Sequence, residues 1–404
     1  MSWFAICGGG RKEEPGNDKV RDGSNVQEYK IELESVNYWE YVKTAGFSID
    51  TLKSGVQRPG GFPVAHRKRL WERVVDEAKG ELHDEHPQTW NDNVYAEASQ
   101  FVEGTVLDIF RTYSDTMDGD GNGAATSYLD REQSKEGLSA PVYKAIHQIK
   151  LDLDRSQQIY NDRLIKLLLT FVVGNKNPKY GQEIFVQGMD AIAHMLIGVL
   201  DDEHAYWAFT IICEVSLEDY FTHGLEGARI EIEVFTKLLK EKIPKIPKTL
   251  LEFPHVRGEE EVTMYINAFT FQWFQKLFAG CLPRDTALHV FDIYFTLMCS
   301  REGARELQHA VGLSIFMMIE PQFYRAKGLD EAKVLIQEFV GESNTDNYGK
   351  LARPEVSHQF MKIVYEFLEE LQEEDILAVR AQAEKKMRAQ ERKMEMRRSR
   401  MKRG

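Results

Sequence analysis

The stretch Ile149-Lys150-Leu151-Asp152-Leu153-Asp154-Arg155, followed further along by Phe185-Val186-Gln187-Gly188-Met189, decides how the rest of the chain is interpreted. Asp152 and Arg155 are three residues apart, so they share one face if the segment is a helix. Glycine after Gln187 permits a special turn and a close approach of the backbone. An arginine and a glutamine, each at the end of an element, are therefore predicted to point into one cleft. Taken singly, the first motif is better explained as a surface ion pair and the second as a helix-capping glutamine, because short patterns often occur by chance.

Helical patterns surround both motifs and continue to the end of the chain. The apolar segment 164–173 predicts a buried helix that Gly174 and Asn175 end, because both residue types supply a left-handed cap at little cost. Apolar residues at 192, 195, 196 and 199 recur at helical spacing. Further helices are predicted at 203–214, 228–243, 261–278, 284–298, 306–319 and 355–374, with stops at Pro244, Gly280 and Pro321. No alternating strand run of good quality occurs, so the expected fold is all-α.

Composition limits the class of protein. The 404 residues are 43 % hydrophobic, enough for a real core. No apolar run reaches the length of a transmembrane helix, and the first residues lack the features of a secretory signal. The four cysteines are scattered at 7, 213, 281 and 299, which indicates reduced thiols and neither a disulfide framework nor a zinc site. We therefore expect a cytoplasmic protein without a metal or another cofactor of its own.

Charge is distributed unevenly along the chain. The net charge of −13 argues against general nucleic-acid binding. Residues 376–404 hold eleven Lys or Arg and three Glu, a net charge of +8, so the other 375 residues carry −21. This basic tail could contact anionic lipid, which would place the protein peripherally on endomembranes, or fold back on the acidic body. Methionines at 387, 394 and 401 are seven apart, but one column is too thin for a coiled coil, and a solvated single helix is expected.

The sequence suggests three parts. Residues 1–27 are predicted to be disordered, 28–345 to form the main domain, with a first helix or clamp at Tyr29–Tyr41, and 346–404 to form the C-terminal helix with its basic tail. The histidines of His83-Asp84-Glu85-His86 lack an obvious third ligand, so a solvated loop is expected. The loop that starts at Asp118 resembles a calcium loop, but Leu129 stands where the bidentate carboxylate is needed, so a flexible insertion is expected. Oligomeric state is left open.

Three motifs together resemble the TBC domain, the catalytic domain of Rab GTPase-activating proteins. That family carries R-x-x-x-W, I-x-x-D-x-x-R and Y-x-Q-G-M in this order. Here they read Arg67-Lys68-Arg69-Leu70-Trp71, Ile149–Arg155 and Phe185–Met189. In the second half, Trp273-Phe274 with Leu277-Phe278 resembles the family's W-F-x-x-L-F, and Val290-Phe291-Asp292 stands where it usually has I-W-D. The resemblance covers roughly Ser54 to Gln322.

The resemblance implies an activity and a role for each motif residue. Arg155 would be an arginine finger and Gln187 a glutamine finger, both supplied in trans to a Rab-family GTPase in its GTP state. Arg67 would pair with Asp152 and hold the finger helix. The remaining motif residues would support the site: Trp71, Ile149, Phe185, Gly188 and Met189. No P-loop motif occurs in the sequence, so GTP and Mg²⁺ would belong to the partner. Such a protein would regulate vesicle trafficking.

Three departures from the family pattern bear on activity. Ser156 stands where many members have Thr, Phe185 replaces the usual Tyr, and Phe291 replaces a Trp. None removes a finger, so an active GTPase activator is favoured. The alternatives are a catalytically silent TBC-like protein that binds a Rab or serves as a scaffold, and a calcium-responsive adaptor that uses the Asp118 loop. No motif reports which Rab is recognised.

Overall fold

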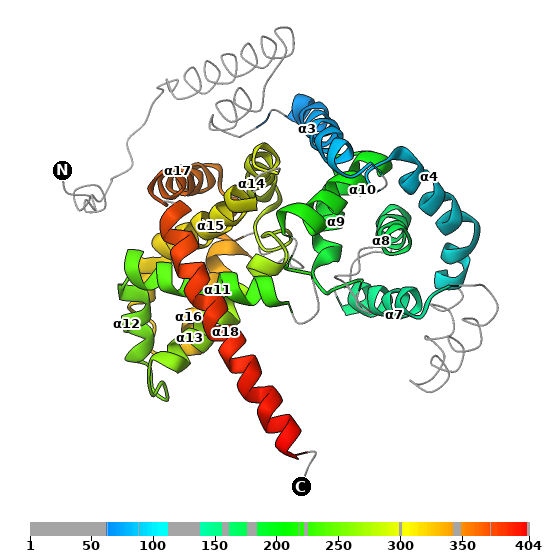
Figure 1. Ribbon diagram of the computed structural model, residues 1–404. Coiled ribbons are helices and arrows are strands. Elements are labelled where there is room, and N and C mark those ends of the chain that lie inside the picture. Colours follow the sequence, from blue (N-terminus) through cyan, green and yellow to red (C-terminus); the bar gives the residue numbers. More distant parts are fainter. Residues whose placement is uncertain are drawn as a thin grey trace, which may run out of the picture. The chain divides into compact units, whose positions relative to one another are not determined.

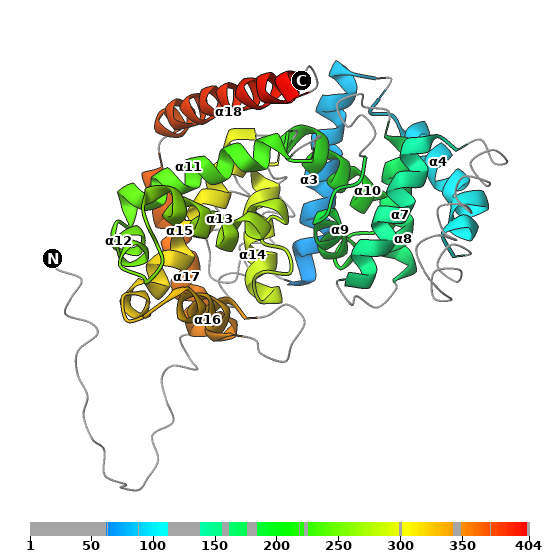
Figure 2. The same ribbon diagram turned by 90° about the horizontal axis from the view of Figure 1, so that it is seen from below.

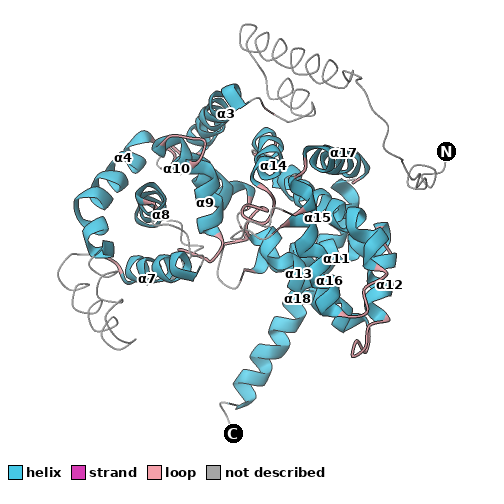
Figure 3. Ribbon diagram, turned by 180° about the vertical axis from the view of Figure 1, so that it is seen from behind, coloured by secondary structure: helices cyan, strands magenta, loops and turns pink. Residues whose placement is uncertain are grey.

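The structure is a computed structural model that describes residues 62, 64–87, 89–111, 138–155, 161–175, 184–217, 219–221, 225–298, 301–341, 349–371 and 373–401. The chain divides into two units, Met1–Gly46 and Phe47–Gly404, and all of these residues belong to the second. They form helices and turns without a strand (Figures 1 and 3), as the all-α prediction required. The predicted disordered segment 1–27, the Tyr29–Tyr41 helix and the Asp118 loop lie outside the described residues.

The helices have the following bounds in chain order. They are α3 (Val64–Glu85), α4 (Asp92–Phe101), the π-helix η2 (Val102–Val106), α7 (Ala140–Arg155), α8 (Asp162–Gly174), α9 (Met189–Ile197), α10 (Asp202–Ile211), the π-helix η4 (Ile212–Ser216), α11 (Glu226–Lys242), α12 (Lys245–Leu251), α13 (Glu259–Gln275), α14 (Arg284–Thr296), α15 (Arg301–Phe323), α16 (Leu329–Val340), the 3₁₀ turn η5 (Lys350–Ala352), α17 (Pro354–Glu370) and α18 (Glu373–Met401).

Helix α8 is the centre of the packing around the two motifs. It contacts α4, α7, α9 and α10 (Figure 1). All residues from Leu164 to Val172 are buried except Lys166, which is partly exposed. Phe171 packs edge-on against Phe209 of α10, with ring centroids 4.9 Å apart. Burying one such side chain stabilises the fold by about 1.5–3 kcal/mol. The prediction of a buried helix here is confirmed.

The end of α8 differs from the prediction. The helix ends at Gly174 as expected, but Asn175 has φ −75° and ψ 116°, so the predicted left-handed cap is wrong. The Asn175 side chain donates to Glu214 Oε1 at 2.8 Å, and its backbone N–H donates to Phe171 O at 2.9 Å, which together hold it extended. Glycine at 174 serves packing instead, because a Cβ there would lie 2.7 Å from the Tyr206 hydroxyl oxygen.

The helices from α11 to α17 bury a second group of aromatic side chains. Phe235 of α11 lies 5.3 Å from Phe274 of α13 and 6.0 Å from Phe316 of α15, measured between ring centroids. Helix α15 also packs on α16 and α17. Gly312 of α15 allows this approach, because a Cβ there would lie 2.7 Å from the Phe235 ring. The two aromatic groups are joined where α3 packs on α10 and α14.

Several helix boundaries were predicted incorrectly. Pro321 lies inside α15, which continues only two residues further, to Phe323; the proline has no N–H to donate to Met317 O, so it weakens the helix without ending it at once. Pro244 ends α11 as predicted, but it is also the N-cap of α12, which the sequence reading missed. Helices α4 and α16 were missed as well. The predicted solvated loop His83–His86 is exposed as expected, but His83–Glu85 form the last turn of α3 and only His86 follows the helix.

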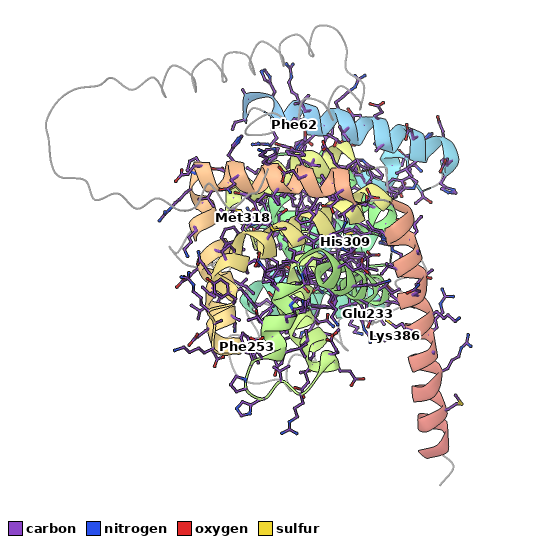
Figure 4. All side chains as sticks on the ribbon, turned by 90° about the vertical axis from the view of Figure 1, so that its left-hand side faces the viewer. Phe62, Glu233, Phe253, His309, Met318 and Lys386 are labelled. Atoms are coloured by element: carbon purple, nitrogen blue, oxygen red, sulfur yellow. The ribbon has the colours of Figure 1, made fainter. Side chains whose placement is uncertain are left out.

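The C-terminal helix α18 is partly built into the fold. Its buried residues Ile376, Val379, Ala383 and Met387 lie on one face, at helical spacing, towards α11 and α15. Figure 2 shows α18 alongside α11. The prediction of a helix is confirmed, but a fully solvated helix was wrong for this first half. The views in Figures 1 and 4 agree that the remainder of α18 runs clear of the other helices.

A buried ion-pair group fixes α18 in place. Arg380 of α18 donates through Nε and Nη2 to the Glu231 carboxylate of α11, at 2.6 and 3.0 Å, and His309 Nε2 donates to the same carboxylate at 2.9 Å. Burial alone would raise the pKa of Glu231, but the hydrogen bonds from His309 and Arg380 outweigh it and hold the pKa at about 2. A peripheral pair adds to the attachment, since Lys386 contacts Glu233 at 2.5 Å (Figure 4).

Two further features concern location and redox chemistry. Among the helices that the structure describes, none has both the length and the apolar character to cross a membrane. Cys213 and Cys281 are free thiols. Burial raises the pKa of both, that of Cys281 to about 11, so neither is a reactive thiolate at neutral pH. Cys7 and Cys299 lie outside the described residues.

Candidate functional site

The glutamine turn, which we define as residues 184–189, leads into α9 and is held by its flanks. Phe185 and Met189 are buried, whereas Gln187 is exposed. The Met189 N–H donates to Val186 O at 3.2 Å, and the Val186 N–H donates to Met189 Sδ at 3.3 Å. The apolar flanks thus anchor the turn from both sides and leave the Gln187 carboxamide towards solvent.

Gly188 is the N-cap residue of α9 and has a φ of +100°, a conformation that side chains other than glycine rarely adopt. A Cβ at this position would lie 3.1 Å from Gln275 Cγ and 3.3 Å from Lys276 Cγ, at the end of α13. Its N–H donates to Asp190 Oδ1 at 3.2 Å. The need for glycine here thus has two physical reasons, the backbone angle and the contact with α13.

Three residues of this environment were missed from the sequence. Asp190, in the first turn of α9, is 6 % exposed, and burial raises its pKa while the positive charge of Lys276 acts in the opposite direction. Gln275 is buried, and Lys276 is partly exposed. The available signal was local: Asp190 follows Gly188 by two residues, and an acidic side chain in the first turn of a helix can accept an N–H that has no partner within the helix.

Arg155 is the last residue of α7, but its side chain lies outside the described part of the structure, as do residues 156–160 with Ser156. Ile149 is fully buried, and Asp152 is buried and accepts a hydrogen bond from Gln148 Nε2 at 3.1 Å. Helix α7 packs on α8 and α9. The two motifs therefore lie on neighbouring helices, while the shared cleft for Arg155 and Gln187 stays a prediction.

The predicted pairing of Arg67 with Asp152 is wrong. Arg67 Nε donates to Asp292 Oδ1 at 2.9 Å and its Nη2 to Oδ2 at 3.0 Å; Trp71 Nε1 and the Phe62 N–H donate to the same carboxylate, each at 2.9 Å. The reason is the packing of the helices. Arg67 lies on α3, which packs on α10 and α14, whereas Asp152 lies on α7, which packs on α8 and α9.

Arg67 and Trp71 of α3 and Asp292 of α14 form a buried group that holds the two helices together. Arg67 is 7 % exposed, Asp292 is fully buried, and Trp71 stacks on Phe295 with ring centroids 4.2 Å apart. Burial raises the pKa of Asp292 to about 6, with the Arg67 guanidinium opposing that rise, so the carboxylate is ionised at neutral pH. The prediction that Trp71 is a core residue is confirmed. Both motif residues of α3 act by holding this helix against α14.

Phe291, where the family usually has Trp, borders a small cavity. The ring is buried 6.2 Å from the Trp71 ring. The cavity offers about 10 Å³ to the centre of a water-sized sphere, near the minimum for one water. Its other lining residues are Leu277, Phe278, Val290, Tyr294, Leu307, Gln308 and Val311. Phe291 is thus a packing residue, as predicted.

Within the described residues, one group has metal-ligating side chains close together: Glu72, Asp201 and His204. Asp201 is the N-cap of α10 and accepts the His204 N–H at 3.0 Å, and His204 Nδ1 lies 2.8 Å from the same oxygen. Hydrogen bonds account for these contacts, and an acidic group at a helix start is common without an ion. The group gives no reason to assign a metal.

The arrangement of helices is that of Rab-GAP TBC domains. A Chlamydomonas flagellar RabGAP TBC domain superposes with a TM-score of 0.52 at 13 % identity, covering 86 % of this chain and 96 % of that one. The Ypt/Rab-GAP domain of Gyp1p superposes with a TM-score of 0.53 at 14 % identity, covering 83 % and 98 %. At such identities the likeness concerns the fold alone.

The sequence relationship defines the family. The sequence model described as Rab-GTPase-TBC domain matches residues 65–324, more than half of the chain, and the chain therefore belongs to this family. TBC1 domain family member 30 of Mus musculus is 24 % identical over 326 residues, 78 % of this chain and 36 % of that protein. The GTPase-activating protein MSB4 of Saccharomyces cerevisiae is 24 % identical over 294 residues, 65 % of this chain and 57 % of that protein. The chain thus spans about a third of the first relative and little more than half of the second.

Proposed function

We propose that this protein accelerates GTP hydrolysis on a Rab-family GTPase in its GTP state, with Arg155 and Gln187 as the groups supplied in trans. Membership of the Rab-GTPase-TBC domain family supports a Rab GTPase-activating role. The observation that carries the proposal is the glutamine turn: Gln187 is exposed between the buried residues Phe185 and Met189. A side chain held at its base and free at its tip can enter the active site of a partner.

Arg155 would supply charge. A GTPase alone has too little positive charge over the phosphoryl group in transfer, and an arginine provided in trans accelerates hydrolysis by about 10³–10⁵. In barrier height this is roughly 4–7 kcal/mol. Arginine suits the role because its planar guanidinium stays charged and can bridge two phosphate oxygens. Arg155 is the last residue of α7.

Gln187 would orient the attacking water. A carboxamide is a neutral donor and acceptor, so it can hold a water through its oxygen and a phosphoryl oxygen through its NH₂ group. Asp152 would support α7, and the contact of Gly188 with α13 would fix the direction of the turn. GTP and Mg²⁺ would be bound by the partner. Arg67 and Trp71 would contribute through the stability of α3 rather than through contact with the finger helix.

The cellular setting follows from the same proposal. A Rab GTPase-activating protein regulates vesicle trafficking from the cytoplasm, at the membrane that carries its Rab. The C-terminal part of α18 would supply a peripheral contact, because it runs clear of the other helices and is followed by further Lys and Arg (Figure 1). Each basic residue near an anionic surface contributes about 1 kcal/mol. Co-sedimentation with phosphatidylserine vesicles, compared between the wild type and an Arg397→Glu/Arg398→Glu/Arg400→Glu variant, tests this contact: equal binding would exclude it.

The experiment that tests the activity is single-turnover GTP hydrolysis across a Rab panel. The expected result is acceleration of at least one Rab, lost by two or more decades in both Arg155→Ala and Gln187→Ala. Lys333→Ala, at an exposed position of α16, is the matched control and keeps the wild-type rate. A wild type that binds a GTP-loaded Rab without accelerating hydrolysis would instead support the catalytically silent alternative, and the departures at Ser156 and Phe185 would be the first positions to restore.

A further inference from the structure

The face of α9 next to the glutamine turn meets two cations from other helices. Asp190, His194 and Gly198 are four residues apart, so they lie along one face of α9. Lys276 lies at the first end of this face, with its Cγ against Gly188. Arg284 lies at the other end, where its Nη2 would be 3.0 Å from a Cβ at Gly198.

Positive charge remains at the surface at both ends of this face. Arg284 is exposed and Lys276 partly exposed, and neither forms an ion pair with any residue that the structure describes. Asp190 lies beside Lys276 and offsets part of its charge, but the Asp190 carboxylate is buried and also accepts the Gly188 N–H. Asp285 follows Arg284, yet successive helix residues point about 100° apart, so its carboxylate leaves α14 in another direction. The positive charge is therefore presented to solvent.

The position of these residues relative to Gln187 decides what they can meet. With about 1.5 Å of rise per residue, the face from Gly188 to Gly198 is roughly 15 Å long. One protein–protein interface of ordinary size can cover a face of this length. If Gln187 enters the nucleotide site of a GTPase, the surface that surrounds that site must cover the neighbouring residues of α9 and the end of α13.

We propose that Lys276 and Arg284, at the two ends of this face, form a basic strip that docks acidic side chains of the GTPase next to its nucleotide site. The inference rests on the proposed function, since it uses Gln187 as the point of entry. Charges at the rim of an interface act mainly on the association rate and on its dependence on salt. At 0.15 M salt such interactions reach about 8 Å, so the strip selects among GTPases by the charge of the nearby surface.

A left-handed turn after α13 supports a role for this end of the helix. Leu277 and Phe278 have φ values of 50° and 62°, and both are buried. Such conformations cost of order 1–3 kcal/mol each and persist where the surroundings enforce them, often beside functional sites. Here the turn follows directly on Gln275 and Lys276, so it fixes the place where Lys276 leaves the helix beside Gly188.

The test measures binding and hydrolysis separately. The affinity for Rab proteins loaded with a non-hydrolysable GTP analogue is measured at 20 and 500 mM salt for the wild type, Lys276→Glu, Arg284→Glu and Lys333→Glu. Lys333 is an exposed lysine on α16, which packs mainly on α15 and η5, and its reversal changes the net charge equally. We expect each strip reversal to weaken binding about tenfold at 20 mM salt and less than threefold at 500 mM. The control should remain within twofold.

Two further variants separate charge from packing. Lys276→Met retains Cγ against Gly188 and removes only the ammonium group, so it should lose affinity in the same direction as Lys276→Glu but less. Replacing an acidic residue of the bound Rab with Lys should restore the affinity of Arg284→Glu. If Lys276→Glu and Arg284→Glu bind the loaded Rab as tightly as Lys333→Glu at low salt, the proposed docking role of the strip is wrong, even when hydrolysis is accelerated. If the strip reversals weaken binding but the wild type accelerates no hydrolysis, the strip stands as a docking surface and the catalytic proposal fails. A wild type that binds none of the GTP-loaded Rab proteins overturns both.

Discussion

Arg67 and Asp292 lie 225 residues apart in the chain and form a buried ion pair with an Nε–Oδ1 distance of 2.9 Å. The pair joins α3 to α14, and the indole N–H of Trp71 completes it at 2.9 Å. Because α3 also packs on α10, the pair connects the helices around the glutamine turn to the helices of the second half. The arginine of the first motif thus serves the assembly of the domain.

Asp292→Asn should destabilise the protein by about 3–5 kcal/mol, because it leaves a buried guanidinium without its counter-charge. The free energy of unfolding from urea titration measures the effect. The control removes a surface ion pair of α3, Lys68 with Glu72 at 3.4 Å. Lys68→Ala should cost no more than about 0.5 kcal/mol. Equal changes in the free energy of unfolding for the two substitutions would show that the buried pair stabilises the protein no more than a surface pair does.

Acid should weaken the attachment of α18 through Glu231. The folded-state pKa of Glu231 is about 2, below its usual 4.5, so the folded protein binds fewer protons than the unfolded one between these values. The stability that ionised Glu231 provides is therefore fully present above pH 4.5 and lost as pH falls towards 2. The difference corresponds to about 3 kcal/mol. Urea titrations at pH 5 and pH 3 should show a smaller loss of stability in Glu231→Gln than in the wild type; parallel losses would contradict this assignment.

Gly188→Ala should impair hydrolysis without unfolding the domain. The φ of +100° and the 3.1 Å approach to Gln275 Cγ both oppose a Cβ, so the glutamine turn must move, at a cost of about 1–3 kcal/mol. We expect at least a tenfold lower rate of Rab-stimulated hydrolysis and a small decrease in Tm. Gly80→Ala is the control: it lies within α3 with open space around a Cβ, so it should stabilise slightly and leave the rate unchanged. A fully active Gly188→Ala would show that the turn needs no fixed conformation.

Phe185→Tyr, which restores the residue usual in the family, should change hydrolysis by less than about threefold. The Phe185 ring is 5 % exposed and anchors the glutamine turn by packing, which a tyrosine ring preserves. The added hydroxyl costs about 1–3 kcal/mol if it finds no partner, and this appears as a lower Tm. Single-turnover rates and thermal unfolding measured on the same preparations distinguish the two effects. A gain of tenfold or more would mean that the missing hydroxyl limits activity.

The sequence predicted the features that depend on local pattern. Helical periodicity identified α8, α9, α11, α13 and α14 to within a few residues, and motif order identified the family. Helix ends were less predictable, since Asn175 is extended by its bond to Glu214, a residue far away in the chain. The partner of Arg67 could not be read from the sequence either, because spacing along the chain does not report which helix packs on α3.

The burial of α18 also depends on contacts with distant helices that the sequence does not report. The run of charges from residue 376 onward is typical of a solvated helix, and its second half fits that description. The first half is buried against α11 and α15, where Glu231 accepts from Arg380 and His309 donates to the same carboxylate. A buried carboxylate in α11 is indistinguishable in sequence from an exposed one. Likewise, Gln275 and Lys276 acquire a role only through the contact that Gly188 makes with α13.

The most direct measurement is a double-mutant comparison of single-turnover rates on one responsive Rab, with wild type, Arg155→Ala, Gln187→Ala and the double variant. If both side chains act in one transition state, each single substitution costs 100-fold or more, and the double variant loses little beyond the worse single one. Unchanged hydrolysis by Gln187→Ala, with Arg155→Ala inactive, would contradict the glutamine finger. A wild type that accelerates hydrolysis on no Rab would contradict the catalytic account as a whole.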